Sequence, residues 1–139
     1  EEKLRAVGHE FGAVTGRPRR CGWFDTVVVR YAARVNGLTA LAVTKLDVLD
    51  GFDRIPLGIG YQLDGERVDE MPADVGALER AAPVLETMEG WRSPTSAARS
   101  LSDLPKAARA YLDRLEALAE APIRYVSVGT RRDQIIDVS

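Results

Sequence analysis

The chain has 139 residues, of which 45% are hydrophobic and 29% are charged, and its formal net charge at pH 7 is −2. Such a length and composition are typical of a single globular domain that buries its own hydrophobic core. The slight acidic excess argues against a nucleic-acid-binding module, and the lack of an apolar run of about 18 residues argues against a transmembrane helix.

The one cysteine, Cys21, has no partner for an internal disulfide, which favours a reducing compartment. We therefore expect a cytoplasmic protein without a signal peptide. A nucleophilic role for Cys21 would require His9 as its base, whereas a packed thiol needs no partner, and we favour the packed thiol.

Two helices are predicted in the first part of the chain. Leu4 and Val7 indicate the end of a helix at the start of the sequence. A second helix is predicted over 25–37, because Asp25 is a good N-cap and Asn36-Gly37 is a good C-terminal stop. The valines at 27–29 favour a strand, but the caps and the length favour the helix. Its expected buried face consists of Val28, Tyr31, Ala32 and Val35.

A short strand and a hairpin are predicted next. Residues 38–43 form an apolar run after a glycine, as expected of a strand buried on both sides. This strand ends at Thr44–Asp47, at the edge of the sheet where open α/β proteins bind their ligands. Strict alternation of apolar residues over 55–63, followed by Asp64-Gly65 and by residues 66–71, predicts an antiparallel hairpin.

A looser stretch follows the hairpin. It contains a short helical segment around Val75–Ala82, which Pro83 ends. Residues 90–100 are predicted to form a loop in which Trp91 packs against the core.

The last part of the chain predicts a long helix and two strands. The helix runs from about Leu104 to Ala121, with Ser102 or Asp103 as its cap. Its expected buried stripe is Leu104, Ala108, Tyr111, Leu115 and Leu118. Strands are expected over Ile123–Val128 and 134–138. The fold class is therefore α/β, with mixed strands, an antiparallel hairpin and a long C-terminal helix.

Residues 12–23 read Gly-Ala-Val-Thr-Gly-Arg-Pro-Arg-Arg-Cys-Gly-Trp, with three arginines within four positions. Pro18 fixes its own backbone and biases Arg17 toward an extended conformation, so the guanidinium groups of Arg17 and Arg19 project in defined directions. Such planar forks bind carboxylate and phosphate oxygens through paired hydrogen bonds. The loop therefore predicts a site for a small anion. The alternatives are a solvated surface or a nucleic-acid patch, and the acidic balance disfavours the patch.

Thr-Lys-Leu-Asp at 44–47 resembles the Asn-Lys-x-Asp guanine-reading element of GTP-binding proteins. The Asp47 carboxylate can accept hydrogen bonds from N1–H and the exocyclic amine of guanine, which adenine cannot match because its N1 is an acceptor. The aliphatic stem of Lys45 can lie along the base. A backbone N–H of Ser127–Gly129, at the end of another strand, is a second candidate contact. Taken separately, both segments also fit ordinary strand ends.

Three segments, taken in order, resemble one enzyme family. The first is His9-Glu10-Phe11-Gly12, continuing through the arginine-rich loop to Trp23 and Asp25. The second is Leu38-Thr39, followed by Thr44-Lys45-Leu46-Asp47-Val48-Leu49-Asp50-Gly51, and the third is Val126-Ser127-x-Gly129-x-x-Arg132-Asp133. Together they resemble the C-terminal third of adenylosuccinate synthetase over essentially the whole chain. The resemblance implies that residues 1–139 are the C-terminal part of a larger P-loop-like α/β enzyme.

The resemblance implies a ligase of purine biosynthesis that converts IMP, L-aspartate and GTP, with Mg²⁺, to adenylosuccinate, GDP and phosphate. It implies that the residues binding aspartate and IMP are Ala13, Val14, Thr15, Gly16, Arg17, Pro18 and Arg19, with Arg17 also touching IMP. The implied GTP-binding residues are Arg19, Lys45, Leu46, Asp47, Ser127, Val128 and Gly129. Val14 stands where many members carry a threonine, which leaves Thr15 as the hydroxyl ligand.

The resemblance also implies what the chain lacks. The phosphate-binding glycine loop, the catalytic aspartate, the catalytic histidine and the main Mg²⁺ site belong to an N-terminal region outside residues 1–139. No catalytic residue or metal ligand is therefore expected here, and His9 is no substitute. The whole enzyme is expected to be a homodimer that binds neither nucleic acid nor membrane. The alternatives are a standalone, non-catalytic guanine-nucleotide-binding domain and, less favoured, RNA binding through Arg17, Arg19 and Arg20.

We expect the 139-residue chain by itself to have no synthetase activity, because it lacks the residues that the family uses for catalysis. Mixing it with IMP, aspartate, GTP and Mg²⁺ should leave the nucleotide absorbance unchanged. A change that depends on the chain would contradict this expectation.

Overall fold

The computed structural model describes residues 1–138, in which helices and strands alternate along the chain, as the predicted α/β class requires. In chain order the elements are α1 (Glu2–Val7), β1 (Phe24–Asp25), α2 (Thr26–Asn36), β2 (Leu41–Val43), the short 3-10 helix η1 (Leu46–Leu49), β3 (Arg54–Leu63), β4 (Glu66–Val68), α3 (Val75–Arg80), β5 (Ala82–Glu89), η2 (Leu101–Asp103), α4 (Lys106–Ala119), β6 (Ile123–Ser127), η3 (Arg132–Gln134) and β7 (Ile135–Asp137).

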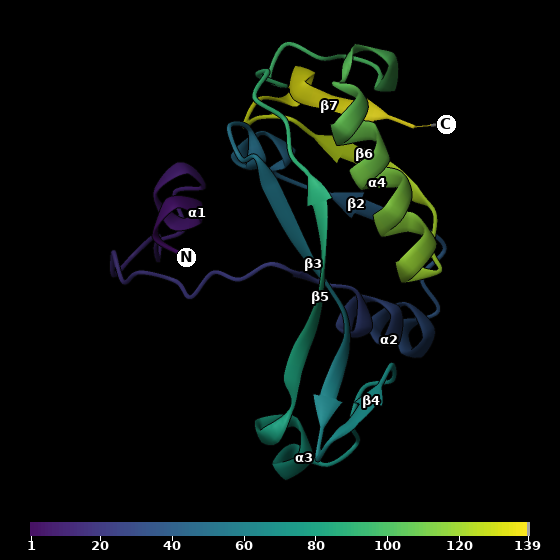
Figure 1. Cartoon of the computed structure of the whole chain (residues 1–139). Helices are drawn as coiled ribbons and strands as arrows, with labels where there is room; N and C mark the ends of the chain where they lie inside the picture. Colours follow the sequence, from purple (N-terminus) through teal and green to yellow (C-terminus); the bar gives the residue numbers. More distant parts are fainter. Residues whose placement is uncertain (139) are drawn as a thin grey trace.

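A long antiparallel ribbon forms the first sheet. β3 pairs with β5 from Arg54↔Glu89 to Gln62↔Ala82, while β1 pairs in parallel with Leu57 and Gly58 of β3, and β4 pairs antiparallel with residues 61–63 of β3. The ribbon extends away from the rest of the molecule, and its far end carries α3 and β4 (Figure 1). The predicted hairpin is confirmed: Asp64 and Gly65 both have positive φ, at 50° and 92°, the conformation of a two-residue turn whose twist matches that of the strands.

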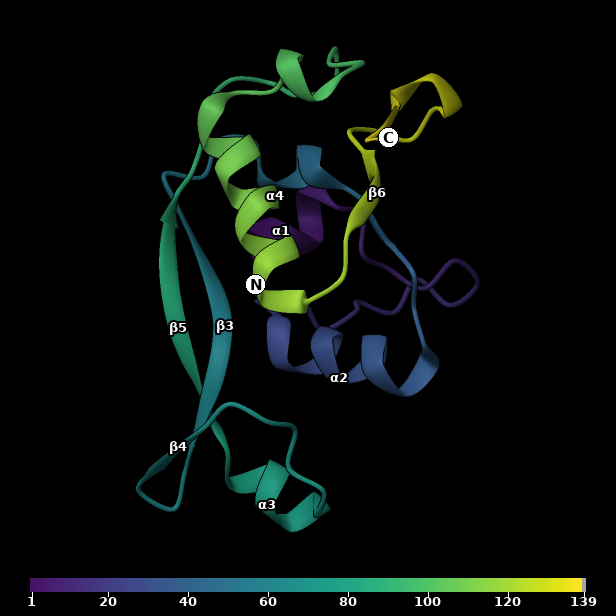
Figure 2. The same cartoon turned by 90° about the vertical axis from the view of Figure 1, so that its right-hand side faces the viewer.

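The second sheet has the order β2-β6-β7. β2 and β6 are parallel, so their C-terminal ends lie at the same edge, and β7 returns antiparallel to β6. α4 lies between the β3–β5 ribbon and β6 (Figure 2). The core therefore forms where the inner faces of both sheets meet this helix. Its fully buried side chains include Leu46, Ile55, Leu57, Leu115, Val126 and Ile136.

Two aspartate carboxylates, Asp50 and Asp25, hydrogen-bond segments that are distant in the chain and so hold them together around this core. Asp50 accepts hydrogen bonds from Trp91 Nε1 at 2.6 Å and from the backbone N–H of Thr95 at 2.8 Å, and Trp91 packs on Tyr111 with ring centroids 5.8 Å apart. Trp91 is 4% exposed, so its predicted packing role is confirmed. Asp25 accepts from two backbone N–H groups of α2 and from the Tyr61 hydroxyl, at 2.6 Å. Polar groups at these junctions are thus satisfied internally.

The bounds of α2 match the prediction, with Asp25 as N-cap and Gly37 as a left-handed C-cap, but the predicted buried face is wrong. Val28, Tyr31 and Val35 are between 42% and 61% exposed. Tertiary contacts turn the other face inward: Thr26 Oγ1 donates to the Gly58 carbonyl at 2.6 Å, and Arg30 Nη1 donates to the Leu118 carbonyl at 3.2 Å. The apolar pattern therefore predicted where the helix lies in the sequence, but not which of its faces is buried.

Four other points of the prediction need correction. β2 is not buried on both sides: Ala42 is exposed, because β2 pairs only with β6 within the part of the chain that the structure describes. β5 was not predicted and extends β3 into the long ribbon. Neither Ser102 nor Asp103 caps α4, whose N-cap position is Pro105; Asp103 instead pairs with Ser100 at the start of η2. α4 spans Lys106–Ala119 rather than Leu104–Ala121, and β6 and β7 follow it.

Gly90 tests the packing at the base of the ribbon. A Cβ at this position would lie 2.0 Å from the Phe52 carbonyl oxygen, whereas a Cβ at Gly22 would meet no atom within 4 Å. We expect Gly90→Ala to lower the free energy of unfolding by about 2–3 kcal/mol, since the backbone of 52–53 must shift. Gly22→Ala is the matched control and should change it little. Urea unfolding followed by tryptophan fluorescence measures both, and equal stabilities would contradict the expectation.

Candidate functional site

The arginine-rich loop is closed at its base. The N–H of Gly12 donates to the Arg17 carbonyl at 2.8 Å, and Phe11 and Pro18 form an isolated antiparallel bridge. Gly16 has φ 64°, a left-handed conformation that a residue with a Cβ adopts only with strain. The Thr15 hydroxyl accepts from the N–H of Arg17 at 3.3 Å. The loop is therefore a compact turn with a defined base.

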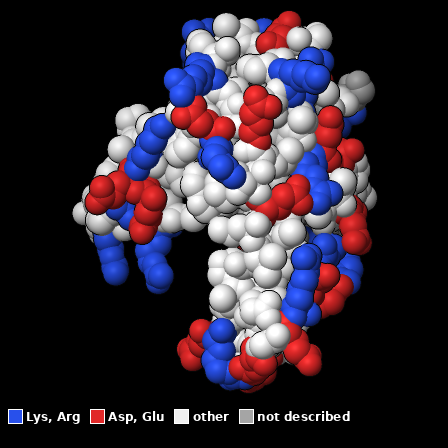
Figure 3. All heavy atoms as spheres, viewed as in Figure 1, with Lys and Arg blue, Asp and Glu red and all other residues white. Residues whose placement is uncertain are grey.

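The three arginines of the loop differ in their contacts. Arg19 Nη1 donates to Glu10 Oε2 at 3.0 Å, which fixes its side chain. The side chains of Arg17 and Arg20 are exposed and make no hydrogen bond or ion pair within residues 1–138. Figure 3 shows basic side chains reaching out from the lobe that contains α1, beside a group of acidic side chains. One guanidinium is thus held in place and two are free to contact an anion.

Lys45 begins the segment that follows β2. Its backbone is left-handed, with φ 61° and ψ 38°, and turns the chain sharply into η1. Its N–H donates to Ser127 Oγ at 3.5 Å, and Ser127 Oγ donates to the Gly129 carbonyl at 3.1 Å. The parallel pairing of β2 with β6 thus brings together the two segments that the sequence proposed as guanine contacts.

Asp47 lies on η1 with an incomplete set of hydrogen bonds. Its Oδ1 atom is buried and has no hydrogen-bond partner among the described residues. Burial raises the pKa of this carboxyl, and the nearby Asp50 charge adds to the effect. A carboxylate oxygen in this state lacks the donors that buried polar groups normally have. Asp47 therefore keeps a hydrogen-bond acceptor that no donor of residues 1–138 uses.

Glu10 joins the two parts of the site. Its Oε2 accepts from Arg19, and its Oε1 forms an ion pair with the Lys45 ammonium, which also donates to the Gly8 carbonyl at 2.8 Å. These two cations lower the pKa of Glu10, Lys45 having the larger effect. The arginine-rich loop and the segment after β2 therefore meet at one carboxylate.

Two adjoining clefts lie beside this junction. One of about 250 Å³ contains Glu10, Cys21 and Lys45, and one of about 380 Å³ lies between β2 and α4. Both are lined by Phe24, Thr44, Lys45, Leu49 and Tyr111. Asp47, residues 13–19 and residues 127–129 line neither cleft.

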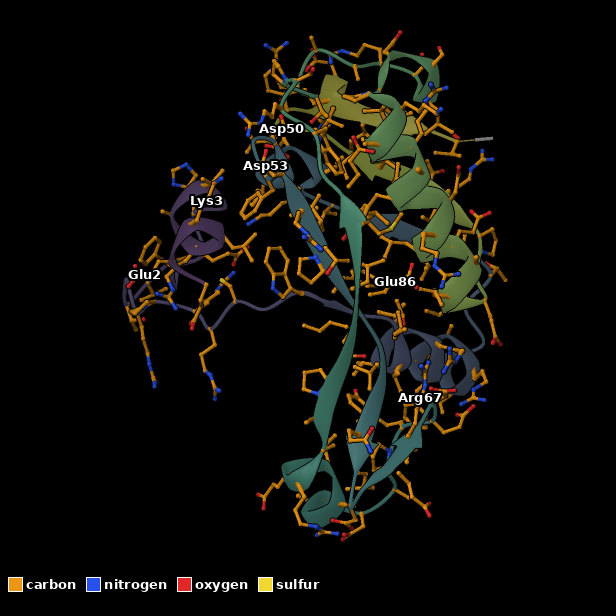
Figure 4. All side chains as sticks on the ribbon, in the orientation of Figure 1. Glu2, Lys3, Asp50, Asp53, Arg67 and Glu86 are labelled. Carbon is orange, nitrogen blue, oxygen red and sulfur yellow. The ribbon has the colours of Figure 1, made fainter. Side chains whose placement is uncertain are left out.

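The sequence reasoning missed Glu10, whose carboxylate joins the two parts of the site, and Asp50, which accepts hydrogen bonds from Trp91 and Thr95 of the fold beside it. Figure 4 shows Asp50 and Asp53 in the loop before β3, and Lys3 on the neighbouring α1; Lys3 Nζ donates to the Gly51 carbonyl at 2.9 Å. Both missed residues lie within the quoted motifs, but their partners are distant in the chain. Among residues 1–138, no group of three or more His, Cys, Asp or Glu side chains is placed to hold a metal ion, and no helix is long and apolar enough to cross a membrane.

Comparisons with known proteins agree on one family. A sequence model of the adenylosuccinate synthetase family matches residues 1–136. The chain is 55% identical to adenylosuccinate synthetase from Geobacter sulfurreducens, covering 99% of this chain and 32% of the relative, and 57% identical to that from Geotalea daltonii, covering 97% and 31%. A solved structure of fully ligated adenylosuccinate synthetase from Plasmodium falciparum superposes with a TM-score of 0.94 at 33% identity, covering 99% of this chain and 34% of that chain. The chain thus spans about a third of the length of these relatives.

The raised pKa of Asp47 predicts how stability depends on pH. Because the folded state holds this proton more tightly than the unfolded chain, the free energy of unfolding falls as pH rises from the unfolded-state pKa through the folded-state pKa. We expect Asp47→Asn to be more stable than the parent chain at pH 7, with the difference vanishing below the unfolded-state pKa. Urea unfolding at several pH values measures this difference.

Asp53→Asn is the matched control with the opposite sign. Its pairing with Arg92 lowers the pKa of Asp53, so the substitution should destabilise the chain at pH 7 and lose its effect as pH falls through the folded-state pKa. An Asp47→Asn variant that is less stable than the parent at pH 7 would contradict the burial argument.

Proposed function

The chain belongs to the adenylosuccinate synthetase family, and on that premise we propose that it forms part of a ligase that joins L-aspartate to IMP with the use of GTP. The chain would contribute binding residues for aspartate, IMP and the guanine base. The unpartnered Asp47 oxygen is the observation that carries this proposal, since Asp47 lies two positions after Lys45 in the segment that resembles a guanine-reading element.

The arginine-rich loop is the proposed site for aspartate and IMP, over Ala13–Arg19. The exposed guanidinium of Arg17 and the hydroxyl of Thr15 have the chemistry to bind carboxylate and phosphate oxygens. Arg19 would contribute positive charge between the aspartate and the nucleotide phosphates. A fixed cation stabilises the negative charge that develops during phosphoryl transfer from GTP to the 6-oxygen of IMP.

The base of GTP would bind at Lys45–Asp47, closed by Ser127–Gly129. The Asp47 carboxylate would accept from N1–H and the exocyclic amine of guanine, which would give its buried oxygen the donors it lacks. A Cβ at Gly129 would lie 2.3 Å from Gln134 Oε1, so the Gln134 amide packs directly against this glycine.

Several parts of the proposed enzyme lie beyond these residues. The described residues offer no carboxylate cluster that fits Mg²⁺, so none of them is assigned to it; bound elsewhere, the ion would neutralise the phosphates. We also propose that the whole enzyme is a cytoplasmic homodimer that binds no nucleic acid. The second candidate is a non-catalytic guanine-nucleotide-binding domain, which the same Asp47 oxygen favours. Detection of adenylosuccinate formation by a full-length synthetase carrying this chain separates the two.

The guanine site predicts a change of base preference. In a full-length synthetase carrying this chain, Asp47→Asn should raise the KM for GTP about 100-fold, because the charged acceptor of two guanine donors is lost. The same variant should use xanthosine triphosphate better than GTP, since an asparagine amide can donate to the 2-carbonyl of xanthine while its oxygen accepts from N1–H. Steady-state kinetics with both nucleotides and with ATP measures the preference.

Asp53→Asn is the matched control for this experiment, because Asp53 is an exposed aspartate of the loop that follows η1 and pairs with Arg92. It should leave the order of preference unchanged. Equal KM values for GTP in the Asp47→Asn and parent enzymes would overturn the assignment of the guanine site.

A further inference from the structure

Glu10 is the one residue that contacts both proposed binding elements within residues 1–138 through its side chain. Arg19 belongs to the proposed aspartate loop, and Lys45 belongs to the proposed guanine segment, 35 positions from Glu10 along the chain. Each cation takes a different oxygen of the carboxylate. If either cation moves away, the Glu10 carboxylate therefore interacts more strongly with the cation that remains.

The backbone around Glu10 keeps this carboxylate in place. The N–H of Glu10 donates to the Arg5 carbonyl at 3.0 Å, and the carbonyl of Glu10 accepts from the N–H of Arg19 at 2.9 Å. Arg5 Nε donates in turn to the Arg19 carbonyl at 2.8 Å. Glu10 thus lies at the closed base of the loop, whose exposed end is Thr15–Arg17.

The exposure of the three side chains shows that stability is not the main consequence of these contacts. Glu10 is 24% exposed, against 48% for Lys45 and 58% for Arg19. Ion pairs at such surfaces contribute only about 0–1 kcal/mol to stability. A carboxylate shared by two cations nevertheless constrains where both ammonium and guanidinium groups lie, which is what a binding site requires of its charged residues.

We propose that Glu10 is a positioning residue that couples the two binding elements, holding Lys45 for the nucleotide and Arg19 for aspartate. This inference rests on the proposed function. When Lys45 is removed, Glu10 interacts with Arg19 alone and draws it from the aspartate carboxylate. When Glu10 is neutralised, Arg19 and Lys45 both lose their ion pairs with it, so Lys45 no longer affects the position of Arg19. Coupling between ligands at two sites is expected to change affinity by about 5-fold or more.

A double-mutant cycle on the KM for aspartate tests this coupling, in a full-length synthetase carrying this chain. Glu10→Gln and Lys45→Met should each raise the KM for aspartate about 5-fold, because each disturbs Arg19. The double variant should show no larger KM than Glu10→Gln alone, since the effect of Lys45 passes through Glu10. Because residues in direct contact can be non-additive in stability alone, the KM for aspartate must rise while the free energy of unfolding stays within about 1 kcal/mol of the parent. A matching loss of stability would indicate a structural role only.

Asp64→Asn is the matched control, because it removes an exposed ion pair of 2.8 Å with Arg80 at the far end of the ribbon. It should leave the KM for aspartate unchanged. A double variant whose KM equals the product of the two single effects would overturn the role of Glu10. If guanine preference at Asp47 persists in that case, the proposed function stands without the coupling. If the parent enzyme does not ligate aspartate to IMP, both proposals fail.

Discussion

The position of the candidate site depends on the parallel pairing of β2 with β6. Parallel strands end at the same edge of a sheet, so Lys45 and Ser127 become neighbours although 82 positions separate them in the chain. The same edge leaves room for the sharp turn into η1, which the left-handed backbone of Lys45 makes possible. Without this pairing, the segments at 44–47 and 127–129 would be unrelated strand ends.

The aspartates near this edge illustrate the difference between structural and available carboxylates. Asp50 accepts from Trp91 and Thr95, and Asp25 accepts from α2 and Tyr61, so both serve the fold. Asp47, only three positions before Asp50, has a buried oxygen without a partner and a pKa raised by burial. A group that lowers the stability of the free protein in this way is typical of a binding residue, because the ligand supplies what the fold does not.

Local signals predicted the elements well, and long-range contacts account for the errors. The cap at Asp25 and the turn at Asp64-Gly65 depend on neighbouring backbone groups, and both were predicted correctly. The buried face of α2 depends on contacts such as Arg30 with Leu118, 88 positions away, which no periodicity reveals. β5 alternates partly buried and exposed residues on a ribbon, so its apolar signal is weak. The partners of Glu10 were hidden for the same reason, since Lys45 is distant in the chain.

The arrangement of charge in the loop fits the anion site that we propose there. Arg19 is tied to Glu10 at the closed base of the loop, while Arg17 and Arg20 are exposed. A fully free set of arginines would lose side-chain entropy on binding, and a fully paired set would have to break existing ion pairs. Because the Arg19 guanidinium is paired with Glu10, it stays close to Lys45. The unpaired guanidinium groups of Arg17 and Arg20 still offer hydrogen-bond donors to a carboxylate or phosphate.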